Sequence, residues 1–226
     1  MVHRRLAPDF MSETVGVVIS SYGSREPWNT LAMRAMTSVT RQTRPPDAVF
    51  RIHHNTLHEA RNKGGQLVGV DWLCFLDCDD ELEPNYLELM MESGEPNELR
   101  YPRVRYVTDG FDPKCPPEPR TLQRKPLWQG NFMVIGTLVR RSFFLAAGGF
   151  RELPAYEDWD LWIRCWLLGC NPTFIPKAVY RAWRRPDGRN APGLIDSPTD
   201  LCARIVEYNR RWLVCHPTVH RGDKDL

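Results

Sequence analysis

The chain has 226 residues, 42% of them hydrophobic and 26% charged, a globular composition that does not depend on disulfides or metal for folding. Lys and Arg total 30 against 28 Asp and Glu, so the net charge of +2 gives no nucleic-acid or anionic-membrane signature. The cysteine count of seven is odd and there is no CxxC pair, which argues against a disulfide framework or a zinc ribbon and predicts reduced thiols.

No apolar run approaches the roughly 18 residues that a membrane-spanning helix needs. The basic start, residues 1–8, lacks the apolar stretch of a signal peptide. We therefore expect a soluble cytoplasmic protein without a transmembrane segment. Residues 1–13 are expected to form a flexible tail, and residues 14–226 a single domain, because no linker or internal repeat interrupts them.

The N-terminal part of the chain alternates between strands and helices. Short apolar runs rich in β-branched or aromatic residues predict buried strands at 15–19, 48–52 and 72–76. Helical spacing of apolar residues predicts helices at 27–42 and 57–68. Strand, helix and strand over these lengths form a βαβ unit, so we expect an α/β fold with a mostly parallel central sheet flanked by helices.

Later elements are less regular. Further strands are expected at 100–108, 132–135, 138–139, 173–175 and 178–180. Further helices are expected from residue 83 onward and at 142–147, 156–168 and 199–214. Proline-rich segments at 112–126 and 184–198 are expected to be surface loops, the first of them near the substrate.

Four carboxylates follow the third predicted strand: Asp77, Asp79, Asp80 and Glu81. Alternate residues of an extended segment point to the same side, so Asp77 and Asp79 are expected to converge at the sheet edge where ligands bind. Crowded carboxylates are unfavourable without a cation, and oxygen ligands suit Mg²⁺ or Mn²⁺, which also bind phosphates. The residues indicate a site for a metal and a diphosphate; a solvated acidic turn before the next helix is the alternative.

Two more carboxylates, Glu157 and Asp158, open a later helix. Tyr156, Trp159 and Trp162 surround them with aromatic side chains, and such a setting raises the pKa of a carboxylate by desolvation. A raised pKa suits a general base. The alternative for the same residues is a simple cap of the helix N-terminus.

Arg61 and two histidines lie near the same predicted sheet edge. A guanidinium such as that of Arg61 bonds a carboxylate or phosphate through two parallel hydrogen bonds, although most surface arginines are merely solvated. His53 and His54 are adjacent in a predicted strand, so their side chains are expected to point to opposite faces rather than to one metal ion.

Four segments carry a family resemblance: residues 15–22, 60–64, 75–84 and 139–162. In this order they are similar to the first strand and nucleotide loop, the Ala-Arg-Asn-x-Gly element, the metal-binding DxD segment, and the acceptor-side helix of family 2 glycosyltransferases with the GT-A fold. The resemblance implies a single GT-A domain. Its Rossmann-like half at 14–108 would bind a nucleotide-diphospho-sugar and a metal, and its half at 109–226 would bind the acceptor and end in a helix.

The resemblance also implies roles on the donor side. Ser21 and Tyr22 would line the nucleoside pocket, and Arg61 would shape that pocket or touch the nucleotide. Asp77 would bond the ribose or help the metal, and Asp79 would ligate Mn²⁺ or Mg²⁺. The implied reaction moves the sugar to an acceptor hydroxyl with inversion, and the acceptor is a glycan, a protein or a small molecule.

On the acceptor side, the resemblance implies that Asp158 is the general base and Glu157 its catalytic neighbour. The sequence departs from the family pattern at two places. His53 stands where the family has an acid that reads the base, so a uracil preference does not follow. No histidine completes the metal site near residue 184, where Arg184 or Arg185 would neutralise the diphosphate instead.

Two other functions compete with glycosyl transfer. A nucleotidyltransferase or sugar-phosphate pyrophosphorylase on a similar sheet would carry a glycine-rich phosphate loop near the N-terminus, and residues 22–26 do not form one. A non-catalytic nucleotide-sugar-binding module would have lost turnover. The acids Asp77, Asp79 and Asp158 favour an enzyme.

Overall fold

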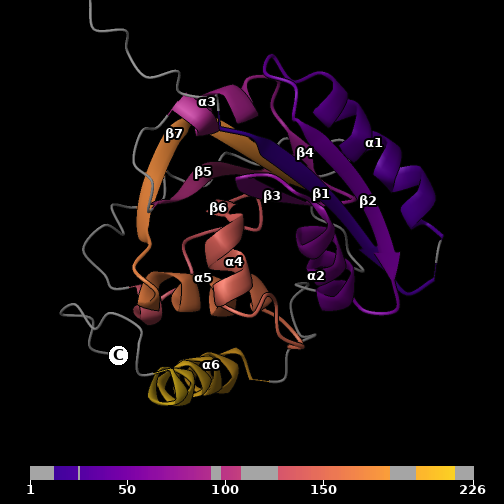
Figure 1. Cartoon of the computed structure of the whole chain (residues 1–226). Coiled ribbons are helices and arrows are strands. Elements are labelled where there is room, and N and C mark those ends of the chain that lie inside the picture. Colours follow the sequence, from indigo (N-terminus) through magenta and orange to yellow (C-terminus); the bar gives the residue numbers. More distant parts are fainter. Residues whose placement is uncertain (1–12, 25, 93–97, 108–126, 184–196, 217–226) are drawn as a thin grey trace, which may run out of the picture.

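The computed structural model describes residues 13–24, 26–92, 98–107, 127–183 and 197–216. These residues form one α/β domain, a curled sheet of seven strands flanked by helices (Figure 1). The expected single α/β domain is therefore confirmed. We expected loops at 112–126 and 184–198; residues 112–126 and 184–196 lie outside the described residues, and Pro198 instead begins a helix that Ser197 caps.

The N-terminal elements alternate as predicted. They are β1 (Val15–Tyr22), α1 (Trp28–Thr40), β2 (Ala48–His54), α2 (Leu57–Leu67) and β3 (Trp72–Asp77). β1 lies between β2 and β3 and pairs in parallel with both. Each strand extends beyond its apolar run at the carboxyl end, because polar residues continue the ladder there although they break the hydrophobic pattern.

The remaining elements complete the sheet and its helical cover. They are β4 (Glu81–Leu82), α3 (Tyr86–Glu92), β5 (Glu98–Val107), a 3-10 helix η2 (Leu127–Gln129), β6 (Leu138–Arg140), α4 (Arg141–Ala146), α5 (Glu157–Leu167), β7 (Asn171–Trp183) and α6 (Pro198–Cys215). Gly148, Gly149 and Gly169 have positive φ angles and end α4 and α5, as the glycines in the sequence predicted.

The strand order is β2-β1-β3-β6-β5-β7-β4. β6 runs antiparallel to β3 and β5, and β4 runs antiparallel to β7, whereas β5 and β7 are parallel. The sheet is thus parallel through its first three strands and mixed beyond them. Helical crossovers connect β1, β2 and β3, and parallel pairing requires connections of this kind.

In Figure 1 the sheet arches over α2, α4 and α5, whereas α1 and α3 lie on its outer side. An aromatic cluster fills the inner side. Phe75 of β3 stacks edge-on against Phe150 at 4.9 Å between ring centroids and lies 5.2 Å from Phe144 of α4, and Phe150 contacts Trp162 of α5 at 6.4 Å. These rings fix α4 and α5 against the strand that ends at Asp77.

The strand predictions were wrong at two places. Residues 132–135 are irregular, and Met133 and Ile135 are buried from a loop, so their apolar pattern reflected core packing without strand pairing. The separate strands at 173–175 and 178–180 form one strand, β7. Its pairing with β5 shifts register between Pro102 and Arg103, and this irregularity interrupts the apolar pattern without ending the strand.

The tail expected at residues 1–13 lies outside the described residues except for Glu13, which is anchored. Its carboxylate accepts a hydrogen bond from Trp72 Nε1 at 2.8 Å and pairs with Arg140. Cysteines 74, 78, 165, 170, 202 and 215 are free thiols, in line with the expected reduced state, and Cys115 lies outside the described residues. No helix in the described part of the chain is both long and apolar enough to cross a membrane.

Candidate active site

The residues predicted for the donor side meet where β1, β2 and β3 end. In the parallel ladders Ser21 lies opposite His53, and Ser20 lies opposite Asp77. Parallel strands present their carboxyl ends at one edge of the sheet, which is why residues far apart in sequence gather there.

Arg61 joins this edge to the helix that carries the acceptor-side acids. Its side chain is 2% exposed and comes from α2, one turn after the helix begins. Nη2 donates to Asp77 Oδ1 at 2.5 Å, and Nη1 donates to Glu157 Oε1 at 2.6 Å. Burial alone would lower the pKa of Arg61, but the charges of Asp77 and Glu157 outweigh burial and raise it. One buried cation therefore binds two motif carboxylates from separate parts of the chain.

Asp158 and Glu157 differ in surroundings although they are neighbours. Glu157 is 4% exposed and is held by Arg61, whereas Asp158 is half-buried and accepts a hydrogen bond from the Trp159 backbone N–H at 2.8 Å. Burial, and then the charge of Glu157, raises the pKa of Asp158 to about 7, against the opposing effect of Arg61. Asp158 thus has the protonation behaviour of a base that works near neutral pH.

The backbone before these two acids is strained. Tyr156 precedes α5 with φ +60° and ψ +24°, the left-handed region that large side chains rarely adopt. Such a conformation persists where surrounding contacts fix it, and it is found most often at functional sites. The start of α5 is therefore held in place rather than relaxed.

Asp79 and Asp80, next to each other after β3, have different environments. Asp80 is buried; the Tyr180 hydroxyl donates to its Oδ2 at 2.7 Å, and the Trp183 backbone N–H donates to its Oδ1 at 2.8 Å. Burial and the charges of Asp79 and Asp77 raise the pKa of Asp80 well above its ordinary value. Asp80 thereby ties the acidic segment to β7, and Asp79 is half-buried beside it.

The described residues contain no group of three His, Cys, Asp or Glu side chains that would enclose a metal ion. One oxygen of Asp77 is bonded to Arg61, so Asp77 and Asp79 offer few protein ligands. Mg²⁺ typically binds through one or two carboxylates, several waters and the phosphates of a substrate. The carboxylate ligands of Asp77 and Asp79 fit an ion that binds together with a diphosphate. They do not fit an ion that is coordinated by protein ligands alone. Arg184, the other residue expected near the diphosphate, lies outside the described residues.

His53 and His54 point to different partners, as their alternation predicted. His53 Nε2 lies 3.0 Å from the Gly23 carbonyl oxygen, which only accepts, so Nε2 carries the proton. His53 Nδ1 lies 3.0 Å from Ser21 Oγ, and His54 Nδ1 lies 2.8 Å from Glu59 Oε2. Both ring nitrogens of His53 therefore form hydrogen bonds that hold the end of β1 and the loop after it.

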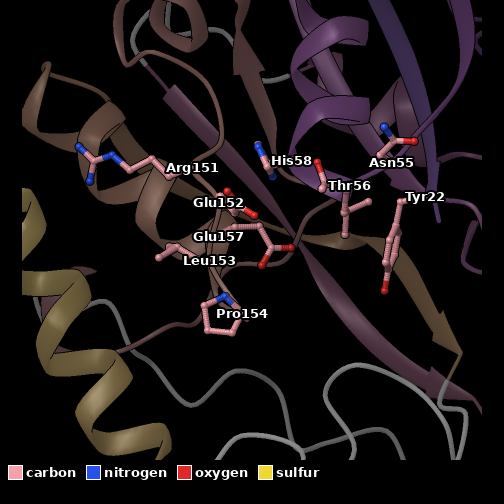
Figure 2. Close-up of a pocket in the computed structure, with 10 residues that line it drawn as sticks. Tyr22, Asn55, Thr56, His58, Arg151, Glu152, Leu153, Pro154 and Glu157 are labelled. Atoms are coloured by element: carbon pink, nitrogen blue, oxygen red, sulfur yellow. The ribbon is translucent and has the colours of Figure 1, made fainter.

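A pocket of about 270 Å³ opens beside this edge, between the loop that starts α2 and the loop that precedes α5 (Figure 2). Its lining residues are Tyr22, Asn55, Thr56, Leu57, His58, Arg151, Glu152, Leu153, Pro154 and Glu157. Tyr22 and Glu157 were predicted as site residues. The sequence analysis did not predict that residues 151–154 line the pocket. The sequence signal for them is that they form a polar, proline-containing stretch just before Glu157 and Asp158.

Asn62, beside Arg61, was also missed. Its Nδ2 donates to the Phe150 carbonyl at 2.8 Å, and the Phe150 N–H donates to its Oδ1 at 2.7 Å. This pair of bonds fixes α2 to the turn after α4. The sequence signal for Asn62 is its place in the Ala-Arg-Asn-x-Gly element at residues 60–64, in which only Arg61 was assigned a role.

Comparison with known proteins agrees with this geometry. The family model described as "Glycosyl transferase family 2" matches residues 17–140. A Haemophilus influenzae protein described as an uncharacterized glycosyltransferase is 25% identical over 167 residues, which cover 69% of this chain and 55% of that protein. The chain therefore spans about half the length of this relative.

Two solved structures share the fold. Staphylococcus aureus TarS 1–349 in complex with UDP-GlcNAc matches 87% of this chain and 66% of its own, with a TM-score of 0.64 and 13% identity. GalNAc-T7 with UDP, GalNAc and Mn²⁺ matches 95% of this chain and 52% of its own, with a TM-score of 0.60 and 18% identity. At these identities the likeness establishes the fold, which is of the GT-A type.

Proposed function

The chain belongs to glycosyl transferase family 2, and on this premise we propose that it transfers a sugar from a nucleotide-diphospho-sugar to an acceptor hydroxyl with inversion. The observation that carries the proposal is the contact of Arg61 with both Asp77 and Glu157. It places the strand end expected to hold the donor directly beside the helix that bears Asp158.

On the donor side, Ser21, Tyr22 and Asp77 line the site of the nucleoside, and Arg61 holds Asp77 in position. Asp79, with Asp77, is the protein ligand of a divalent cation. When bound, Mn²⁺ or Mg²⁺ supplies positive charge for the diphosphate that leaves. The structures of TarS with UDP-GlcNAc and of GalNAc-T7 with UDP and Mn²⁺ support a donor and a cation of these kinds.

His53 and Arg184 have proposed roles at the two ends of the donor. His53 acts on the nucleoside through the loop after β1, because its ring bonds Ser21 and Gly23. Arg184 follows Trp183, whose backbone is bonded to Asp80 in the acidic segment, so its guanidinium is proposed to neutralise the diphosphate.

On the acceptor side, Asp158 is the proton acceptor. Its carboxylate takes the proton of the acceptor hydroxyl as that oxygen bonds to the anomeric carbon and the bond from this carbon to the diphosphate oxygen breaks. A single displacement of this kind inverts the anomeric centre. Glu157 positions Asp158 and raises its pKa, and it takes no proton itself because Arg61 holds it.

The proposal is tested by identifying products. The full chain is incubated with Mn²⁺ and a panel of UDP-, GDP-, ADP- and dTDP-sugars, and products are identified by mass spectrometry. Glycosyl transfer releases a nucleoside diphosphate and leaves the sugar on the acceptor, and slow hydrolysis with water as acceptor releases a nucleoside diphosphate and the free sugar. Pyrophosphate chemistry would instead release a sugar 1-phosphate when pyrophosphate is added, and donor binding without any product would indicate a non-catalytic module. Either result would overturn the proposal.

A further inference from the structure

Asp160 lies in the first turn of α5, two residues after Asp158, and its side chain is 0% exposed. Arg164 Nη2 donates to its Oδ2 at 2.7 Å. Asn209 Nδ2 of α6, at 2.8 Å, and Arg151 Nη1 of the loop before α5, at 3.1 Å, donate to its Oδ1. The buried carboxylate of Asp160 thus accepts hydrogen bonds from side chains of α5, of α6 and of the loop that lines the pocket.

The backbone of Asp160 adds a fourth contact. Its N–H donates to the carbonyl oxygen of Tyr156 at 3.0 Å. The side chain therefore holds Arg151 and the main chain holds Tyr156, so a single residue fixes both ends of the loop 151–156. This loop forms one wall of the pocket in Figure 2 and ends in the left-handed Tyr156. Strained backbone of this kind needs surrounding contacts to persist.

Arg164 extends the same assembly toward the donor side. Its Nη1 donates to the carbonyl oxygens of Ala147 and, at 2.7 Å, Gly149. The turn that contains them continues into Phe150, which Asn62 of α2 holds by two hydrogen bonds. A continuous chain of bonds therefore runs from α2, which carries Arg61, through this turn to Asp160 in α5.

A buried ion pair is a weak source of stability, because well-packed apolar residues of similar volume often stabilise a core as much or more. Its directional bonds instead fix geometry. Here those bonds converge within one turn of the proposed base.

We propose that Asp160 is a positioning residue for glycosyl transfer, and that Arg151 is the tie through which it holds the loop 151–156 and the start of α5. The inference rests on the proposed function, because it assigns Asp160 to the placement of Asp158. Asp160 touches no substrate; it acts through Arg151 and Tyr156 on the residues that do.

The test uses Arg151→Ala, since removal of Asp160 itself would leave Arg164 buried without its carboxylate and would endanger folding. Arg151→Ala leaves Asp160 bonded to Arg164 and Asn209. Arg151→Lys is the conservative variant. Arg211→Ala is the control, because Arg211 is 75% exposed and pairs with Glu207 on the surface of α6.

Three readouts are required. Hydrogen exchange at the Asp160 amide, which is bonded to Tyr156, should accelerate in Arg151→Ala and stay unchanged in Arg211→Ala. Turnover should fall by about tenfold or more, because small misplacements of reacting groups cost up to about a hundredfold. Affinity for UDP with Mn²⁺ should stay within about twofold of the parent, and Arg151→Lys should recover most of the turnover.

Unchanged exchange at the Asp160 amide would overturn the inference whatever the enzyme does. Faster exchange with unchanged turnover would also overturn it, because the loop would then not position the base. A parent protein without glycosyl transfer on any donor would overturn the proposed function instead, and the exchange measurement would still show whether Arg151 holds the loop.

Discussion

At the scale of single residues, Arg61 shows why the site depends on a guanidinium. A lysine at position 61 would keep the charge, but it lacks the rigid fork that reaches Asp77 and Glu157 together. Removing one member of a buried ion pair leaves the remaining charges uncompensated, at a cost of about 3–5 kcal/mol. The residue therefore holds two motifs together.

We expect Arg61→Met to lower the free energy of unfolding by about 3–5 kcal/mol in urea, with Arg61→Lys recovering only part of the loss. Lys63→Met is the matched control, because Lys63 is exposed on the same helix. If Arg61→Met and Lys63→Met unfold at the same urea concentration, the buried ion pairs of Arg61 with Asp77 and Glu157 do not stabilise the fold.

The adjacent acids Asp79 and Asp80 should separate metal binding from stability. Asp79→Asn is expected to remove the Mn²⁺-dependent gain in UDP affinity measured by calorimetry, at an unchanged melting temperature. Asp80→Ala is expected to lower the melting temperature, because it removes the acceptor of the bonds from Tyr180 and Trp183. Equal Mn²⁺ dependence in Asp79→Asn and the parent would remove Asp79 from the metal site.

Asp158 should make both turnover and stability depend on pH. Its folded pKa of about 7 lies above the ordinary value of 3.8, so the folded chain binds this proton more tightly than the unfolded chain. The stabilising effect of the proton is complete at pH values below about 4 and is lost as the pH rises through 7. Turnover, which needs the carboxylate, should rise with pH around a midpoint near 7.

We therefore expect Asp158→Asn to melt at a higher temperature than the parent at pH 8, by about 2–4 °C for each 1 kcal/mol relieved. Below pH 4 the two should differ little. A lower melting temperature for Asp158→Asn at pH 8 would show that the charge of Asp158 stabilises the N-terminus of α5 and that Asp158 is not a strained base.

At the scale of elements, the turn after α4 constrains the site most sharply. Gly149 has φ +69°, and a Cβ added there would lie 2.4 Å from Asn62 Oδ1. We expect Gly149→Ala to cost about 1–3 kcal/mol in urea unfolding. Gly69→Ala is the control, because Gly69 has open space and no positive φ. Equal unfolding midpoints would show that the turn relaxes without cost.

The elements that the sequence predicted well are those whose periodicity is strong. The strands and helices of residues 15–77 lie within a few residues of expectation. β1 and β3 are continuous buried runs, whereas β2, which was predicted to be buried, is an edge strand whose residues are half-buried or exposed. The errors lie where tertiary packing decides the pattern. Residues 132–135 are apolar because a loop is buried, and β7 is split in the pattern because it carries an irregularity between Ile175 and Val179, which pair with the consecutive residues Pro102 and Arg103 of β5.

Across the whole molecule, the motifs predicted the fold and the meeting of Ser21, His53 and Asp77 where β1, β2 and β3 end. They did not predict that Arg61 meets Glu157, because this contact joins residues 96 apart in sequence and depends on how α5 packs under the sheet. The role of Asp160 is equally invisible in sequence, since its partners come from three separate segments.

We propose that Asp158 is the base of a nucleotide-sugar site that Arg61 joins to the donor side. Donor affinity by calorimetry and nucleoside diphosphate release, measured on one sample of Asp158→Asn, test it most directly. Asp200→Asn, an exposed acid in the first turn of α6, is the control. We predict unchanged affinity with turnover lowered about 10²–10⁴-fold in Asp158→Asn alone. Turnover equal to that of the parent would contradict the account.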